Sequence, residues 1–216
     1  MKRPVRIANC SGFFGDRLAA AQEMVEGGPI DVLTGDWLAE LTMLILARQK
    51  IRHGNGYART FLQQMETVLP ACLEKGIKVV SNAGGLDPEA CAQAIRDLGT
   101  GAKVAAVTGD DVLPRFGEFD WTNLDTGEAF PSHPLSANAY LGARGIASAL
   151  EAGADVVVTG RVTDAALVIG PAAWWHGWDF DGGDLDAMAG ALVAGHVIEC
   201  GAQASGGNYP FFREVP

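Results

Sequence analysis

Short apolar runs that end in a polar, mostly glycine-containing turn recur along this chain, and a helical pattern follows most of them. The runs are "VRIAN" at 5–9, "IDVLTG" at 30–35, "IKVVSNAGG" at 77–85, "KVAAVTGDD" at 103–111 and "DVVVTG" at 155–160. Near-continuous apolar strands that alternate with helices are typical of a parallel sheet covered on both faces. The pattern therefore predicts a three-layer α/β fold with a mainly parallel, doubly wound, Rossmann-like sheet.

Helical patterns occupy the segments between these runs. We expect helices over about 16–26, 36–48, 57–74, 138–151 and 184–200, and further ones from Asp87-Pro88 and from Thr163. The most regular stripe is made by Phe61, Met65, Val68 and Cys72, at spacings that place all four on one helix face. Helix 36–48 likewise carries Leu38, Leu41 and Ile45 on one face.

The domain organisation is simple. No repeat or low-complexity linker divides the chain, so we expect one α/β domain over 1–200, with an irregular insertion or lid at 112–137. The glycine-rich tail 201–216 contains apolar aromatic residues but no further helix or strand pattern. We expect this tail to lead into a missing continuation or to pack on a partner.

Charge and cysteine usage exclude several classes of function. The net charge is −10 and no run of Lys or Arg occurs, which argues against nucleic-acid binding. No apolar run approaches the length of a membrane span, and the four cysteines have no zinc-site spacing. We expect a cytoplasmic protein without a membrane partner, in which Cys72 and Cys91 are packed thiols.

The polar ends of the five predicted strands should meet at one edge of the sheet. In open α/β sheets, ligands bind outside the carboxyl ends of the strands, where the strand order switches. The strand exits include Asn9, Asp36, Asn82, Asp110 and Arg161. Turns of this kind also use such residues for capping, but one arginine, two aspartates and asparagine side chains together exceed that need. The sequence predicts a ligand site here.

Two aspartates and an arginine are the main candidates at this edge. Asp36 is either the N-cap of a helix or a general base that also binds a substrate hydroxyl. Arg161 either pairs with Asp164 or Asp36, or binds a carboxylate, phosphate or thioester-bearing ligand. Asp164 follows three residues later and could orient Arg161 or act catalytically, and Thr163 is placed in the same ligand-binding turn. Of the adjacent Asp110 and Asp111, one should face the crevice.

Two glycine-containing turns offer backbone amides beside helix starts. The turn "NCSG" supplies Asn9, Ser11 and Gly12, and the turn "NAGG" supplies Asn82, Gly84 and Gly85. Amides in such positions can hold an anion or polarise a carbonyl. Neither turn fits a dinucleotide or P-loop fingerprint, so the sequence specifies no cofactor.

The last predicted helix adds a candidate acid–base pair. Leu185, Met188 and Leu192 define a predicted buried face, and His196 and Glu199 continue it. A buried histidine is usually a satisfied core residue, whereas a His–Glu pair can move protons. We favour catalytic roles for both, with Gln203 as a nearby ligand-binding residue. No fixed spacing supports a metal site, and we assign no metal ligand.

Five blocks of this sequence, taken together, resemble the acyclic terpene utilisation family, long described as a domain of unknown function. They are "RIANCSGFFGDR", "VLTGDWLAE", "VVSNAGGLDP", "VVTGRVTDAALVIGP" and "GHVIECGAQASGGNY", which run in order along most of the chain. The resemblance implies a place in the breakdown of citronellol-type, geraniol-type or other branched acids as coenzyme A thioesters. Genes of acyl-CoA carboxylases, hydratases, ligases and dehydrogenases accompany such family members. Family proteins are longer, which implies that this chain is an N-terminal portion.

These observations favour an enzyme that performs hydratase- or lyase-type acid–base chemistry on a coenzyme A thioester or a related acid. Two other classes stay open: a non-catalytic acyl-CoA-binding or scaffold subunit, and a nucleotide- or metal-dependent hydrolase. We expect a small-molecule substrate, a homo-oligomer, and association with acyl-CoA pathway enzymes.

Overall fold

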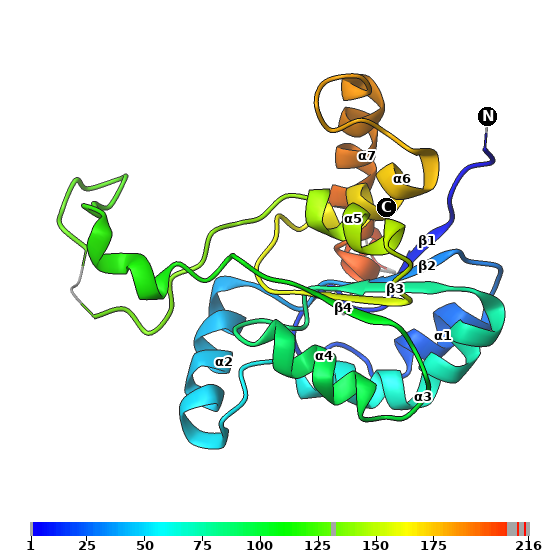
Figure 1. Ribbon diagram of the computed structural model, residues 1–216, viewed down its shortest axis with the longest axis horizontal. Helices are drawn as coiled ribbons and strands as arrows, with labels where there is room; N and C mark the ends of the chain where they lie inside the picture. Colours follow the sequence, from blue (N-terminus) through cyan, green and yellow to red (C-terminus); the bar gives the residue numbers. More distant parts are fainter. Residues whose placement is uncertain (1, 131–132, 207–210, 212–213, 215–216) are drawn as a thin grey trace.

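The computed structural model describes residues 2–130, 133–206, 211 and 214. Its centre is a parallel sheet of five strands in the order β1-β2-β3-β5-β4 (Figure 1). The strand bounds are Ile7–Asn9, Val32–Gly35, Lys78–Ser81, Val104–Val107 and Val156–Thr159 for β1 to β5. Every pair of neighbouring strands is parallel, with Val80 opposite both Thr34 and Val157. The predicted parallel α/β fold is confirmed.

Helices cover both faces of this sheet. In Figure 1, α1, α3 and α4 lie below it and α5, α6 and α7 lie above it. The helix bounds are Ala20–Glu26, Glu40–His53, Arg59–Lys75, Pro88–Arg96, Arg144–Glu151, Ala166–His176 and Leu185–Ile198 for α1 to α7. Two 3-10 helices, η1 and η2, span Leu113–Glu118 and Gly201–Ser205.

Each face of the sheet has its own apolar core. Below the sheet, Leu33, Val79 and Val158 pack with the buried stripe of α3, in which Phe61, Met65, Val68 and Cys72 are all nearly inaccessible, as predicted. Above it, Val80 and Val157 pack with Ile146 and Leu167. Because successive strand residues face opposite cores, both faces of β2, β3 and β5 need apolar residues, and Val32-Leu33, Val79-Val80 and residues 156–158 supply them.

The strand order fixes where a ligand can enter. The connections advance from β1 to β4 with their helices on one face, and the chain then returns through α5 to insert β5 between β3 and β4. The helices that follow β3 and β5 therefore lie on opposite faces. Adjacent strands of this kind define the switch point of an open α/β sheet, so the carboxyl ends of β3 and β5 frame the expected crevice.

Two predicted helix faces are wrong. In α2 the buried residues are Thr42, Met43, Leu46 and Ala47, and the side chains of Leu41 and Ile45 are exposed. In α7 the buried residues are Ala191 and Gly195, whereas Leu185 and Leu192 are 63% and 51% exposed. A helix with apolar residues on all sides gives no periodic signal that identifies its packed face, and in α7 the small residues allow the closest approach to α6.

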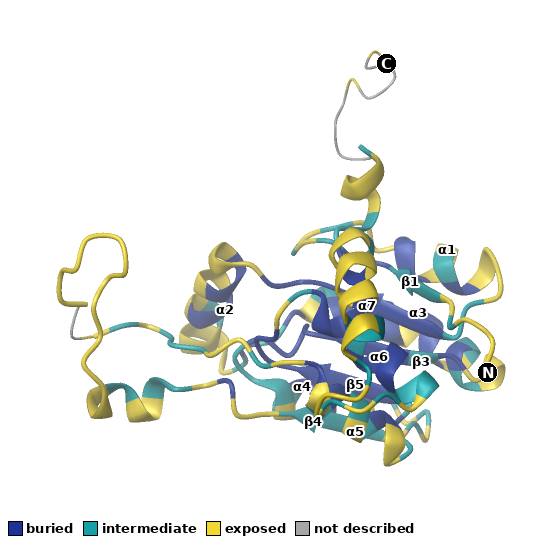
Figure 2. Cartoon of the chain, turned by 90° about the horizontal axis from the view of Figure 1, so that it is seen from above, coloured by how far each residue is buried: buried dark blue, intermediate teal, exposed yellow. Residues whose placement is uncertain are grey.

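The described residues of the segment 112–137 extend away from the sheet and helices (Figures 1 and 2). Its two ends are joined, because the amide of Val112 donates to the carbonyl of Ala137 and Asp111 pairs with Asn138 in an antiparallel bridge. We call the described residues of this segment, 112–130 and 133–137, the arm. Within the part of the chain that the structure describes, no helix has both the length and the apolar character needed to cross a membrane.

Candidate functional site

Side chains from four strand ends and one helix end meet at the predicted edge of the sheet. Asn9 is the last residue of β1, Asp36 directly follows β2, and Asn82 directly follows β3. Arg161 follows β5 by two residues, and Glu199 directly follows α7. The short polar turns after each strand turn these side chains toward one another, so residues far apart in sequence share one site.

Asp36 is a deeply buried acidic group of this site, with 3% of its surface exposed. Asn82 donates its side-chain amide to Asp36 Oδ1 over 2.6 Å, and the amide of Leu38 donates to the same oxygen over 3.3 Å. Burial raises the pKa of the Asp36 carboxyl to about 8, an effect that the Asn82 bond reduces and the charges of Asp164 and Glu199 increase. Helix α2 starts at Glu40 with Ala39 as its N-cap, so Asp36 is not the cap residue.

Three carboxyl groups share this small volume. Ligand oxygens of Asp36, Asp164 and Glu199 all lie within 4.8 Å of one another. The neighbouring Glu199 carboxyl also raises the pKa of Asp36. Burial raises the pKa of Asp164 as well, and the neighbouring Arg161 partly offsets this. Like charges at this separation favour a protonated acid beside an ionised one.

Glu199 is buried at the C-terminal end of α7, with 8% of its surface exposed. The Cys200 thiol donates to Glu199 Oε1 over 3.2 Å, and this bond raises the pKa of the thiol to about 11. Cys200 is therefore a neutral donor, not a nucleophilic thiolate. The side-chain amide of Asn9 donates to the Glu199 carbonyl over 2.7 Å, which ties the end of α7 to the end of β1.

Arg161 forms the cationic wall of the site and is 5% exposed. Its guanidinium donates to the Leu38 carbonyl over 2.8 Å, to Asp164 Oδ1 over 3.2 Å and to the Tyr140 hydroxyl over 2.8 Å. It also lies 4.3 Å from the centre of the Tyr140 ring. The expected pairing of Arg161 with Asp164 is therefore present.

Asp110 holds the backbone of Arg161 in place. Its carboxylate accepts from the Arg161 backbone amide over 2.7 Å and from the Asn138 side chain over 2.9 Å. Gly160 packs so closely against it that a Cβ there would collide with both carboxylate oxygens. Asp110 is buried and Asp111 is exposed, so one of the pair faces inward as expected.

The predicted amide-rich turns are bonded largely within the chain. The Gly12 amide donates to Asp16 Oδ2 and the Gly85 amide to the Asn82 carbonyl. A Cβ on Gly12 or Gly84 would lie 2.5 Å from the carbonyl oxygen of Cys200 or Thr159, so both glycines permit close backbone packing. The Ser11 hydroxyl donates to the Phe13 carbonyl. Close packing and hydrogen bonds within the chain therefore explain why glycine and serine occur in these turns. Ligand binding by their amides stays a prediction.

His196 does not form the predicted inward-facing pair with Glu199. The face of α7 that contacts the domain runs through Ala191, Gly195 and Glu199, which leaves the His196 ring exposed beside Asp164. Thr163 is also exposed, and its amide donates to the Leu141 carbonyl. Gln203 is exposed in η2 and reaches the Gly12 carbonyl over 3.4 Å.

Sequence reasoning missed Glu40, Asn138 and Tyr140. The Tyr140 hydroxyl donates to Glu40 Oε1 over 2.5 Å, and Glu40 lies 3.5 Å from the Arg161 guanidinium. A cleft of about 200 Å³ opens here, lined by Glu40, Met43, Ser136, Asn138, Tyr140 and Arg161. The helix predicted from residue 138 begins only at Arg144, so Asn138 and Tyr140 lie instead in the irregular chain where the arm rejoins the domain.

Among the residues that the structure describes, the oxygens of the three clustered carboxylates are close enough together to surround a divalent cation. Two contacts weigh against that use. Asp36 already accepts two hydrogen bonds on one oxygen, and the Arg161 guanidinium supplies positive charge next to Asp164. The arrangement fits proton transfer better than it fits cation binding.

A comparison with known protein families gives a match that covers this domain. The family model described as "Acyclic terpene utilisation family protein AtuA" matches residues 5–216. Comparisons with curated proteins and with solved structures gave no significant match. The match spans nearly the whole sequence and includes every strand of the sheet and every residue of the site. The chain belongs to the acyclic terpene utilisation family.

Proposed function

We propose that this chain is an acid–base enzyme of acyclic terpene and branched-acid catabolism that acts on a coenzyme A thioester or a related acid. The observation that carries the proposal is the carboxyl group of Asp36, buried beside Glu199 and Asp164 with a pKa raised to about 8. An acid that keeps its proton near neutral pH, next to a second carboxyl group, is suited to proton delivery and removal.

Hydration or dehydration of an unsaturated thioester is the reaction class that uses these groups most directly. One carboxylate takes a proton from a water molecule while the oxygen of that water bonds to the β-carbon. A carboxylic acid then delivers a proton to the α-carbon. The reverse sequence removes water. A C–C lyase reaction would use the same base to deprotonate a hydroxyl group. Asp36 and Glu199 are the proposed proton-transfer pair, and Asp164 tunes them.

The cleft beside Arg161 is the proposed place for the polar end of the substrate. Arg161 presents N–H groups, and Tyr140, Ser136 and Asn138 add further polar side chains around the cleft. Donors held in place by existing hydrogen bonds can stabilise developing charge on a carbonyl oxygen. The acyclic-terpene context comes from the family, and the branched acid and its coenzyme A form are part of the proposal.

The first experiment follows thermal stability of the protein with coenzyme A, with short and branched acyl-CoAs, with nucleotides and with divalent metals. A ligand that binds the folded state raises the melting temperature by mass action. A shift caused by acyl-CoAs supports the proposal. A shift caused only by nucleotides or metals contradicts it and favours a nucleotide- or metal-dependent hydrolase.

Turnover of the acyl-CoAs that bind then separates an enzyme from a binding subunit. We expect Asp36→Asn and Glu199→Gln each to lower the rate about 10²–10⁴-fold, because each removes a proton-transfer group. The matched control is Glu151→Gln, an exposed change at the end of α5. Acyl-CoA binding without turnover, unaffected by either site variant, would instead identify a scaffold subunit.

A further inference from the structure

The arm is a preformed apolar surface that its own domain does not cover. None of its described residues belongs to either apolar core. Phe119, Trp121, Leu124 and Phe130 are 47%, 36%, 100% and 48% exposed. Large apolar side chains that cluster on a projecting segment mark an interaction site.

Contacts within the arm hold this surface in shape. The rings of Phe116 and Trp121 stack with their centres 5.1 Å apart, and the Trp121 indole donates to the Phe116 carbonyl over 2.6 Å. An antiparallel bridge joins Thr122 to Ala129. A surface that is already ordered loses less entropy on association than a disordered loop would lose.

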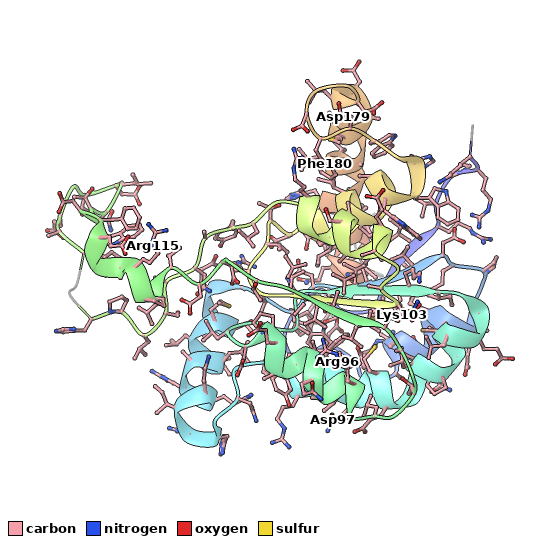
Figure 3. All side chains as sticks on the ribbon, in the orientation of Figure 1. Arg96, Asp97, Lys103, Arg115, Asp179 and Phe180 are labelled. Carbon is pink, nitrogen blue, oxygen red and sulfur yellow. The ribbon has the colours of Figure 1, made fainter. Side chains whose placement is uncertain are left out.

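The arm is also acidic. Exposed acids on it are Glu118, Asp120, Asp125 and Glu128, and its described bases are His133 and Arg115, of which Arg115 is paired with Glu118 over 2.8 Å. Figure 3 labels Arg115 on this projection. Within the described residues, Asp120, Asp125 and Glu128 form no ion pair. An apolar surface edged by unpaired acids requires a partner that is apolar and basic.

The outer face of α2 has that character. Leu41 and Ile51 are 68% and 72% exposed, and Leu44 and Ile45 lie between them with 36% and 38%. The basic residues of the second half of the helix are Arg48, Lys50, Arg52 and His53. Within the described residues these bases form no ion pair. A basic helix is unusual on a chain whose net charge is −10.

We propose that two copies of this chain associate with the arm of each copy packed on α2 of the other. Both features lie at the same end of the molecule in two perpendicular views, and the arm points away from its own α2 (Figures 1 and 2). A two-fold axis beside this end places each arm over the partner's helix. One pair of surfaces is then used twice, as in an isologous dimer.

Charge reversal on each of the two surfaces tests this arrangement. Variant one carries Asp120→Arg and Asp125→Arg on the arm, and variant two carries Arg48→Glu and Arg52→Glu on α2. The mass of each protein in solution is measured by light scattering and sedimentation at concentrations on the order of 50 µM. We expect the unchanged protein to be a dimer, and each variant to dissociate at least about tenfold more readily.

Mixing the two variants should restore the dimer. In the mixed dimer the reversed arm meets the reversed helix and the unchanged arm meets the unchanged helix, so both contacts regain opposite charges. Rescue by mixing cannot arise from misfolding, or from contacts within one copy. All four substituted side chains are exposed, so circular dichroism and melting temperature should stay close to those of the unchanged protein.

Substitution of an exposed leucine outside the proposed interface supplies the matched control. Leu124→Asp on the arm should abolish the dimer, whereas Leu192→Asp on α7, at a residue 51% exposed, should leave it intact. A protein that is monomeric at these concentrations, or a dimer that survives both charge reversals, would overturn the proposal. Loss of the dimer with Leu192→Asp alone would place the interface on α7 and overturn it equally.

Discussion

The Asp36 carboxyl loses water on folding and lies among two other acids, and this has a measurable effect on stability. Its ordinary pKa is 3.8, and in the folded chain the value is about 8. The folded state therefore binds the proton more tightly than the unfolded state. The stabilisation from the bound proton is complete below the unfolded pKa and is lost as pH rises toward about 8.

Asp36→Asn should therefore raise stability, and more so at alkaline pH. The amide keeps the shape of the side chain, can still accept the Asn82 hydrogen bond, and never carries the buried charge. We expect a melting temperature higher by several degrees at pH 9, with a smaller gain at pH 5. Thermal unfolding across this pH range is the measurement. A gain of the same size at both pH values would show that Asp36 does not titrate as described.

The pH dependence of turnover tests the same carboxyl group in its proposed role. If Asp36 acts as an acid, the rate should fall as pH rises through about 8. A profile of rate against pH for the unchanged enzyme provides the measurement, and Glu151→Gln should reproduce it. An alkaline limb that persists unchanged in the residual activity of Asp36→Asn would assign that limb to a different group.

Gly160→Ala should destabilise the fold by about 2 kcal/mol, because the new methyl group collides with the Asp110 carboxylate. That carboxylate holds the Arg161 backbone, so the overpacking also disturbs the site wall. Chemical denaturation gives the free energy of unfolding. Gly142→Ala is the control, since a Cβ at Gly142 has open space around it. Equal effects of the two changes would contradict this account.

At the scale of elements, Asp31 fastens the N-terminal segment to the edge of the sheet. It accepts hydrogen bonds from the side chains of Arg3 and Arg6 and from the Arg6 amide, and the Arg3 bond holds its pKa well below the ordinary value. A lowered folded pKa stabilises the fold above the unfolded pKa. That contribution is lost as pH falls below about 4.

Asp31→Asn should therefore loosen β1 at neutral pH, as acid does in the unchanged chain. We expect faster hydrogen exchange in residues 5–9, with little change in the central strands. Glu23→Gln is the matched control, because its ion pair with Arg17 is exposed on both sides and exposed pairs contribute little. An unchanged rate of hydrogen exchange at β1 would show that the Asp31 contacts are not needed to hold this strand.

Sequence patterns located elements better than they located helix faces. The strands could be predicted because Val, Ile and Leu runs buried on both sides are rare outside parallel sheets, and α3 because its stripe alternates with polar residues. Helix α7 could not be oriented, since Ala and Gly pack inward while Leu192 stays exposed. Asp36 and Arg161 could be placed at one edge from topology alone. The proximity of Glu199 depends on how α7 packs, and nothing local in the sequence encodes that.

At the scale of the whole molecule, the arm and the domain are separable. Val112 and Ala137 are hydrogen-bonded neighbours, so a two-residue Asn-Gly turn can replace residues 113–136. We expect this shortened chain to keep its circular dichroism spectrum and a melting temperature within a few degrees, because the described arm residues contribute nothing to either core. The same shortening should make the protein monomeric. Loss of the folded state would show that the arm supports the domain after all.

The position of β5 also governs the order in which the sheet can be completed. Among the described strands, β4 pairs with β5 alone, and β5 lies later in the chain and is also the neighbour of β3. During synthesis, Val104–Val107 therefore leaves the ribosome with no strand to join, and it stays unpaired until Val156–Thr159 follows. A chain stopped before residue 156 would hold β1, β2 and β3 together and leave β4 as an unpaired apolar segment, which is the kind of intermediate that chaperones bind.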